Sequence, residues 1–345
     1  YLNFFFMKKI LIFKTDRIGD FVNFSPCLKI LKNNFENCHI TLVCSKYNYQ
    51  IAKNYKEIDK IIIIKKKLFL DILFFLKNIF SINYDYLFQF DGNKRSYVLS
   101  CFVSSKIRSA LFFYKNVNFF GLNYKYTRPN FFLRPFFQNS VSCNEDYKIN
   151  NKTTHYQTLY LKLLENLNFK INYKQNIFYL DVNFKNVFDS FYTKINKTYY
   201  LFHIDEKSNT LNHHQFDSLL NLINIVKIKQ NIVLSLGLGK IIHENKIKEK
   251  FDIIEYSNKN NSFKIDDSKV LCLKNLPLNL LAHFIANSEA NISMHSGSIV
   301  HISAAFNKLI VDIIEEHKFN ELDRWIPLVS KYKRFDLNKL ENFKI

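Results

Sequence analysis

The chain has 345 residues, a length that predicts about two domains, each large enough to bury a core without disulfides or metals. Hydrophobic residues make up 48% and charged residues 23% of it, which excludes a wholly disordered chain, a collagen and a coiled coil. With only 6 glycines and 5 prolines, a glycine-rich phosphate loop of the P-loop or dinucleotide type is not expected.

Lysine and arginine (49) outnumber aspartate and glutamate (30), giving a net charge of +19. Such a charge attracts nucleic acid, anionic membrane surfaces or phosphorylated small molecules, without choosing among them. The common nucleic-acid-binding motifs are absent from the sequence, so nucleic acid is not an expected partner. The 17% aromatic content is attributed to AT-rich codon usage rather than to a base-stacking surface.

The six cysteines are scattered without CxxC spacing, which favours a reducing cytosol and argues against a structural metal site. The longest apolar run, 68–82, is too short to span a bilayer and is interrupted by Asp71 and Lys77. Residues 1–6 precede Met7, and we interpret them as upstream translation or a frayed end rather than a signal peptide.

Strands alternate with helices along the first half, which predicts an α/β domain with a parallel sheet. A buried strand over 9–13 leads into a basic-polar turn, then into a helix with apolar residues on one face. The further expected elements are strands over 39–44, 61–64 and 86–90 and helices over 68–82 and 155–167. The stretch 121–151 is expected to be a long irregular connection.

The same pattern restarts after residues 180–197, which are expected to join the two halves. The expected elements are strands over 198–203, 231–236, 270–273, 290–294 and 309–313 and helices over 216–228, 278–287 and 299–306. Ligands of such sheets bind beyond the carboxyl ends of the strands. Two facing halves would place a cleft between them.

Several segments resemble, in order, the blocks of glycosyltransferase family 9, the lipopolysaccharide heptosyltransferases. They are KILIFKTDRIGDFVNFSP (9–26), YDYLFQFDGNKRSYVLS (84–100), 155–168, 232–239, ANISMHSGSIVHISAAFN (290–307) and RWIPL (324–328). The resemblance implies the GT-B fold, an α/β architecture of two Rossmann-like domains whose parallel sheets face a central cleft. It implies an acceptor domain at 7–180, a nucleotide-sugar domain at 198–325, and a segment 326–345 that packs back on the N-terminal domain.

The resemblance also assigns an acceptor-side site to the turn after the first strand. It makes Asp20 the catalytic base that takes a proton from the acceptor hydroxyl, with Asp16 as the alternative carboxylate. Lys14 and Arg17 would hold an acceptor phosphate or carboxylate, and Gly19 would permit the tight turn. The alternative is that Asp20 only complements a helix dipole and that the cations are ordinary surface charges.

On the donor side, a helix N-terminus at 296–298 would bind a diphosphate. The residues assigned to donor binding are Lys207, Glu206, His295, Ser296, Gly297, Ser298 and His301. Lys207 would neutralise the leaving diphosphate, with Glu206 and Asp205 positioning it. This sequence departs from the family at His295, where the family usually has aspartate, and by one extra residue before His301. The alternative is a purely structural role for both residues, with His295 packing in the core and Ser296 capping the helix.

The resemblance therefore implies an inverting, metal-independent glycosyltransferase. Its donor would be a nucleotide-diphosphate sugar such as ADP-heptose, with no other cofactor, and its acceptor a lipid-linked lipopolysaccharide-core or related glycan. The expected location is the cytoplasm, peripheral on the cytoplasmic face of the inner membrane, where the basic charge meets anionic lipid. The alternative is a catalytically degenerate GT-B-fold protein that binds nucleotide sugars or glycans, because the departures lie around the donor site.

Overall fold

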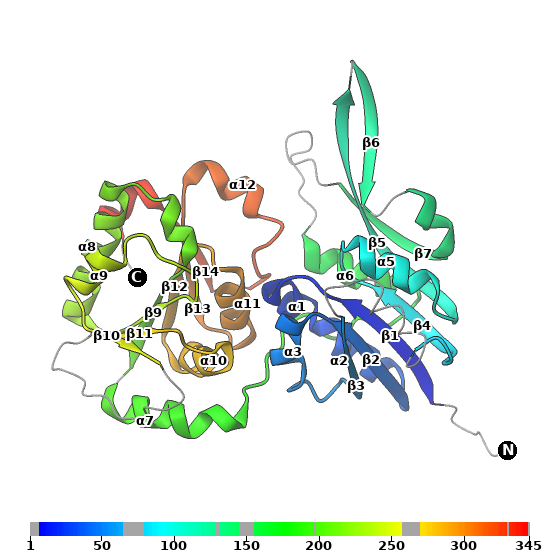
Figure 1. Cartoon of the computed structure of the whole chain (residues 1–345), viewed down its shortest axis with the longest axis horizontal. Coiled ribbons are helices and arrows are strands. Elements are labelled where there is room, and N and C mark those ends of the chain that lie inside the picture. Colours follow the sequence, from blue (N-terminus) through cyan, green and yellow to red (C-terminus); the bar gives the residue numbers. More distant parts are fainter. Residues whose placement is uncertain are drawn as a thin grey trace. The chain divides into compact units, whose positions relative to one another are not determined.

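The computed structural model describes residues 7–64, 79–119, 121–128, 131–144, 155–195, 198–256, 270–329 and 331–343. The chain forms two compact units: residues 1–176 with 323–325, and residues 177–322 with 326–345. Each unit is a sheet covered by helices (Figure 1). The segment 1–6 and nearly all of the helix expected over 68–82 lie outside the described residues. Within the described ranges, no helix is both long enough and apolar enough to cross a membrane.

The first sheet is an open, mostly parallel sheet in the order β3-β2-β1-β4-β5-β6, with β7 paired to β5. Its parallel strands are β1 (Lys8–Lys14), β2 (Cys38–Cys44), β3 (Lys60–Ile63), β4 (Tyr84–Gln89), β5 (Ser105–Phe119) and β7 (Asn139–Asn144). The chain runs from β1 outward to β3 and then returns to place β4 on the other side of β1. The carboxyl ends of β1 and β4 therefore form a topological switch point, where open α/β sheets bind ligands.

Helices cover both faces of this sheet. They are α1 (Ile18–Phe24), α2 (Pro26–Asn34), α3 (Lys46–Ala52), α5 (Lys94–Cys101) and α6 (Tyr156–Glu165). Phe24 of α1 packs on Phe90 and on Tyr160 of α6, at ring-centroid distances of 4.7 and 6.1 Å. The opposite face buries Phe13 in a separate apolar cluster with Tyr97 of α5. The burial of β1 between the two layers fixes the position of the turn that follows it.

The region expected to be an irregular connection is instead largely ordered. Strand β5 pairs with β4 and then extends into an antiparallel hairpin with β6 (Leu122–Arg128), which projects from the sheet in Figure 1. Gly121 has a φ of 76° in the turn of this hairpin, a conformation that favours glycine. The prediction for 121–144 was wrong because mixed aromatic and polar residues hide the period of two on which strand recognition depends.

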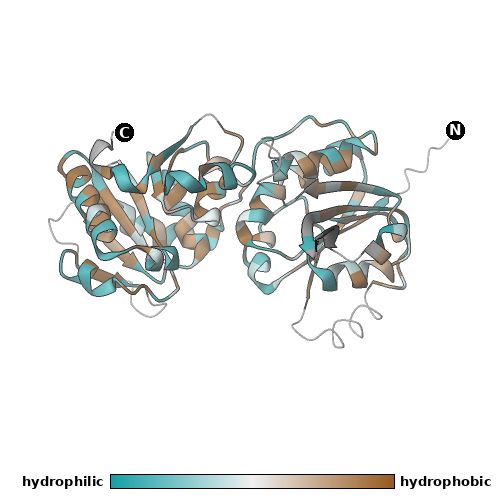
Figure 2. Ribbon diagram, turned by 90° about the horizontal axis from the view of Figure 1, so that it is seen from above, coloured by the Kyte–Doolittle hydropathy of each residue, from teal (hydrophilic) through white to brown (hydrophobic). Residues whose placement is uncertain are grey.

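The second sheet is wholly parallel, in the order β10-β11-β9-β8-β12-β13-β14. Its strands are β8 (Tyr199–Ile204), β9 (Asn231–Leu236), β10 (Ile253–Glu255), β11 (Val270–Lys274), β12 (Ala290–Ser293), β13 (Leu309–Ile314) and β14 (Tyr332–Asp336). Strand order reverses between β8 and β12, so their carboxyl ends form the switch point of this unit. Hydrophobic residues concentrate along the strands of both units (Figure 2).

The helices of the second unit are α7 (Lys185–Ile195), α8 (His213–Lys229), α9 (Glu244–Lys248), α10 (Leu278–Asn287), α11 (Gly297–Ala305) and α12 (Phe319–Leu322). Helix α8 begins with a capping box formed by Asn212 and Gln215. Helix α7 lies in the expected joining segment but belongs to the second unit. Residues 326–345 also belong to this unit, because β14 pairs with β13, whereas only 323–325 belong to the first unit. The expected packing of 326–345 on the first unit stays a prediction.

Candidate functional site

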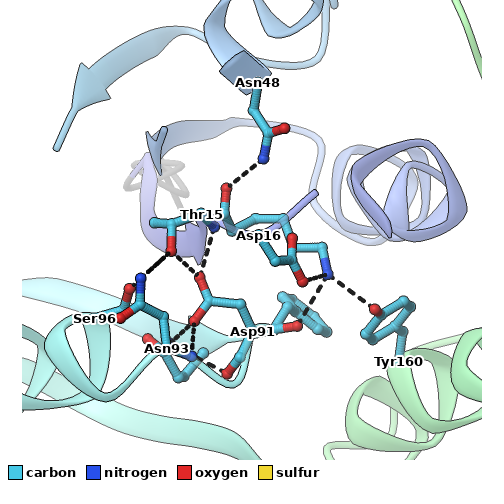
Figure 3. Close-up of polar contacts among 10 residues, drawn as sticks. Thr15, Asp16, Asn48, Asp91, Asn93, Ser96 and Tyr160 are labelled. Atoms are coloured by element: carbon cyan, nitrogen blue, oxygen red, sulfur yellow. Dashed lines mark hydrogen bonds and ion pairs between the residues drawn. The ribbon is translucent and has the colours of Figure 1, made fainter. Parts of the chain in front are cut away.

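Lys14, the last residue of β1, lies buried at the switch point of the first sheet. Its ammonium donates to Asp16 Oδ2 at 2.7 Å, to the hydroxyl of Tyr160 at 2.9 Å and to the carbonyl of Phe90 at 3.2 Å (Figure 3). An ammonium has three N–H donors, so these partners use its capacity. Its side chain is 0% exposed. Lys14 therefore links β1 to the end of β4 and to α6. Of the two cations expected to bind the acceptor, Arg17 is the exposed one.

Thr15 and Asp91 form a second link across the same switch point. Asp91 Oδ2 accepts hydrogen bonds from the Thr15 N–H at 2.6 Å and from its hydroxyl at 2.7 Å (Figure 3). The other oxygen, Oδ1, accepts from the Gln89 amide at 2.7 Å and from the Asn93 N–H at 3.0 Å. The loop after β4 thus holds the turn after β1 in one conformation, which sequence analysis did not reveal.

The two carboxylates of the β1–α1 turn have perturbed proton affinities. Burial raises the pKa of Asp16 to about 8, against the lowering effect of Lys14. Burial also raises the pKa of Asp20, while the cations of Lys14 and Arg17 lower it. Asp20 lies in the first turn of α1, and Gly19, buried in the same turn, has no positive φ. The site thus holds two carboxyl groups of raised pKa, close to the exposed guanidinium of Arg17.

A row of polar side chains crosses the second sheet at its switch point. Ser235 of β9 pairs in register with His203 of β8, His203 with Ser293 of β12, Ser293 with Asp312 of β13, and Asp312 with Arg334 of β14. Residues in lateral register project from the same face of a sheet. The first four are buried, and among the described residues Ser293 Oγ has no hydrogen-bond partner. Burial lowers the pKa of His203.

His295, between β12 and α11, lies against this row. Its backbone N–H donates to Asp312 Oδ1 at 2.6 Å, and its Nδ1 lies 2.5 Å from Asp312 Oδ2. The Tyr332 hydroxyl donates to the same Oδ2 at 2.7 Å. The ammonium of Lys207 donates to the carbonyl of His295. The sequence-predicted residues Lys207 and His295 are thus adjacent, whereas Asp312 and Tyr332 were missed because their partners are distant in the sequence.

The N-terminus of α11 contains the remaining predicted donor residues. Ser296 is the N-cap residue, and its side chain makes no capping hydrogen bond. Gly297 begins the helix, and a Cβ built there would meet nothing within 4 Å. Ser298 is half-buried, while His301, one turn further along, is buried. The position of the Gly297 Cβ is therefore open space at the start of α11, and the first N–H groups of a helix have no acceptor within the helix and attract anions.

Loops after β8 and β9 approach each other closely beside this helix. A Cβ on Gly237 would lie 3.0 Å from the Cβ of Asp205, and one on Gly239 would lie 2.9 Å from a carboxylate oxygen of Glu206. The side chain of Asp205 accepts from the backbone N–H of Lys207 at 3.1 Å. Gly237 thus allows Asp205 to fix the turn that carries Lys207, and Gly239 leaves room for the Glu206 side chain.

Two Rossmann-like units, each with its polar residues at a switch point, define the GT-B class of α/β proteins, and the expected fold is confirmed. No family model matches the sequence, and no curated protein matches it. Solved structures do match. A glycosyltransferase of family 9 from Veillonella parvula superposes with a TM-score of 0.71 at 15% identity, covering 95% of this chain and 86% of that one.

Two heptosyltransferases of E. coli are also similar. WaaC, solved with ADP-2-deoxy-2-fluoro heptose, gives a TM-score of 0.62 at 13% identity, with 96% of each chain covered. ADP-heptose lps heptosyltransferase II gives 0.63 at 14% identity, covering 95% of this chain and 90% of that one. The resemblance to glycosyltransferase family 9 is therefore confirmed at the level of the fold. A UDP-GlcNAc 2-epimerase from Methanocaldococcus jannaschii shares the fold with a TM-score of 0.52, so the fold does not choose the reaction.

Proposed function

We propose that the protein is an inverting glycosyltransferase that moves a sugar from a nucleotide diphosphate to a glycan acceptor. The observation that carries the proposal is Asp20, a carboxylate of raised pKa at the switch point of the first sheet. A base works best when its pKa approaches the working pH, and burial moves Asp20 in that direction. Asp20 takes the acceptor hydroxyl proton, the oxygen bonds to the anomeric carbon, and the bond to the diphosphate breaks.

The second unit supplies the donor site in this proposal. The diphosphate binds at the N-terminus of α11, against the N–H groups that begin at Gly297 and beside the ammonium of Lys207. These groups stabilise the negative charge that grows on the leaving diphosphate, a role that needs no metal ion. Ser296 and Ser298 flank the same helix end, and His295 and His301 face the ribose and phosphates.

The charge of the chain and the fold comparison support a proposal for the acceptor and the location. Arg17 is exposed beside Asp20 and suits bidentate binding of an acceptor phosphate. The net charge of +19 favours association with an anionic membrane surface. We infer a lipid-linked lipopolysaccharide-core or related glycan as acceptor, ADP-heptose as the first donor to test, and the cytoplasmic face of the inner membrane as the place of action.

A panel of nucleotide sugars tests the proposal, first by thermal shift and then by transfer assay with lipid-linked glycans. A bound donor raises the melting temperature by mass action. We expect turnover in the presence of EDTA, with inversion at the anomeric carbon and loss of donor affinity in Lys207→Ala. The alternative, a degenerate nucleotide-sugar or glycan-binding protein, is favoured by His295 at the position of the family aspartate. This alternative predicts binding of the donor without transfer. Epimerisation of the donor sugar would instead indicate a reaction like that of the similar UDP-GlcNAc 2-epimerase.

A further inference from the structure

Asp312 is a charged residue in the middle of the buried strand β13. Its side chain is 0% exposed, and an ionised carboxylate in such a place needs compensating hydrogen bonds. The structure supplies three: two from His295, through its backbone N–H and its Nδ1, and one from the Tyr332 hydroxyl. Burial beside Asp312 raises the pKa of Tyr332, so the phenol keeps its proton and remains a donor.

This arrangement fixes the imidazole of His295. An ionised carboxylate accepts but does not donate, so the proton of the neutral ring lies on Nδ1. Nε2 is on the opposite edge of the ring and points away from Asp312. No other described residue bonds Nε2, although 13% of the side chain is exposed. The ring is thus held by the hydrogen bond of Nδ1 to Asp312, and Nε2 remains available to a ligand.

The backbone at His295 is also held in an unusual conformation. Its φ is 51°, and the other described residues with positive φ are asparagine or glycine. A histidine in the left-handed region is strained and persists only where its surroundings impose it. Here the N–H is bound by Asp312 and the carbonyl by Lys207, so both ends of the residue are fixed. His295 directly precedes Ser296, the N-cap residue of α11.

We propose that Asp312, supported by Tyr332, is a positioning residue that orients His295 so that Nε2 binds a phosphate oxygen of the donor nucleoside diphosphate. The proposal rests on the donor site placed above at the N-terminus of α11. In the imidazolium form, Nε2–H donates to the phosphate while Nδ1–H remains on Asp312. The buried carboxylate balances the ring's charge, and Lys207 and the α11 N–H groups supply the rest of the anion site.

Two measurements on the full chain test this. Long-range ¹H–¹⁵N spectra of ¹⁵N-histidine-labelled protein, assigned with His295→Gln, report the tautomer; we expect Nδ1–H in the wild type and its loss in Asp312→Asn. Calorimetry with ADP, UDP and inorganic pyrophosphate reports the anion site. We expect Asp312→Asn and His295→Gln each to weaken affinity about 10- to 100-fold, the scale of a charge-assisted hydrogen bond. Because both residues act through the same hydrogen bond to the anion, the variant with both substitutions should bind each probe no more weakly than either single variant.

Controls separate positioning from folding. Tyr332→Phe keeps the buried carboxylate and removes one hydrogen bond, so a smaller loss of affinity with the Nδ1–H tautomer retained is expected. Asp217→Asn removes an exposed ion pair with Lys246 and should leave affinity unchanged. An Nε2–H tautomer in the wild type, or unchanged affinity in Asp312→Asn beside a loss in His295→Gln, overturns the proposal alone. A wild type that binds none of the three probes overturns the donor site as well. If Asp312→Asn does not fold, the proposal is tested by the tautomer of His295 in the wild type and by the affinity of Tyr332→Phe for the probes.

Discussion

Replacing Lys14 by methionine should destabilise the first unit. The substitution keeps the length of the side chain but leaves the Phe90 carbonyl, the Tyr160 hydroxyl and the Asp16 carboxylate without their shared donor. Breaking a fully buried ion pair costs about 3–5 kcal/mol. The Asp16 side chain is 25% exposed, and its pKa of about 8 leaves it largely protonated at pH 7, so Lys14 and Asp16 form only a partly ionised pair there. We therefore expect a loss near the lower limit, about 3 kcal/mol at pH 7.

The loss should depend on pH with a definite sign. The pKa of Asp16 is about 8 in the folded protein against 3.8 ordinarily, so between these values the folded form binds a proton that the unfolded form has lost. Stability from this group is complete at low pH and falls as pH rises towards 8. Lys14 lowers this pKa, so its removal strengthens the dependence. The destabilisation should be smaller at pH 5 than at pH 9.

Urea unfolding followed by fluorescence measures this effect in the first unit. Trp325 is the only tryptophan, and it stacks on Tyr156 in that unit with a centroid distance of 3.9 Å. The matched control is Lys106→Met, whose partner Asp85 lies 2.8 Å away but whose side chain is 66% exposed. An exposed pair contributes about 0–1 kcal/mol. Equal losses in the two variants, or a larger loss for Lys14→Met at acid pH, would refute the reasoning.

Three further predictions follow. Asp20→Asn should lower turnover by about 10²–10⁴-fold, while donor affinity measured on the same preparation stays unchanged. Turnover at the wild-type rate in this variant would refute the catalytic assignment of Asp20. Arg17→Gln removes a cation that lowers the pKa of Asp20, so the acidic limb of kcat/KM should move to higher pH; a shift to lower pH would contradict this. Gly237→Ala forces a Cβ against Asp205 and should cost about 1–3 kcal/mol, whereas Gly297→Ala meets open space and should leave the melting temperature nearly unchanged.

Periodicity predicted β1 to β4, β8, β9 and β11 to β13, because each of these strands buries a continuous apolar run, but it did not predict β7, β10 or β14. The strand expected over 231–236 coincides with β9, and the helix expected over 278–287 coincides with α10. The hairpin of β5 and β6 was missed, although Gly121 is a turn signal. Local sequence does not determine pairing between distant strands, so the contact of His295 with Asp312 was also missed. An aspartate inside the apolar run LIVDII was the available clue.

The first unit is not one continuous stretch of chain. Residues 323–325 belong to it, although the chain on both sides of them belongs to the second unit. The Arg324 carbonyl accepts from the N–H of Tyr156, the first residue of α6, at 3.1 Å, and Trp325 stacks on the Tyr156 ring. A gene cut after codon 176 would therefore not separate two self-sufficient halves. The N-terminal fragment would begin α6 with an uncapped donor and a bare aromatic face, and adding 323–325 through a short linker should restore both.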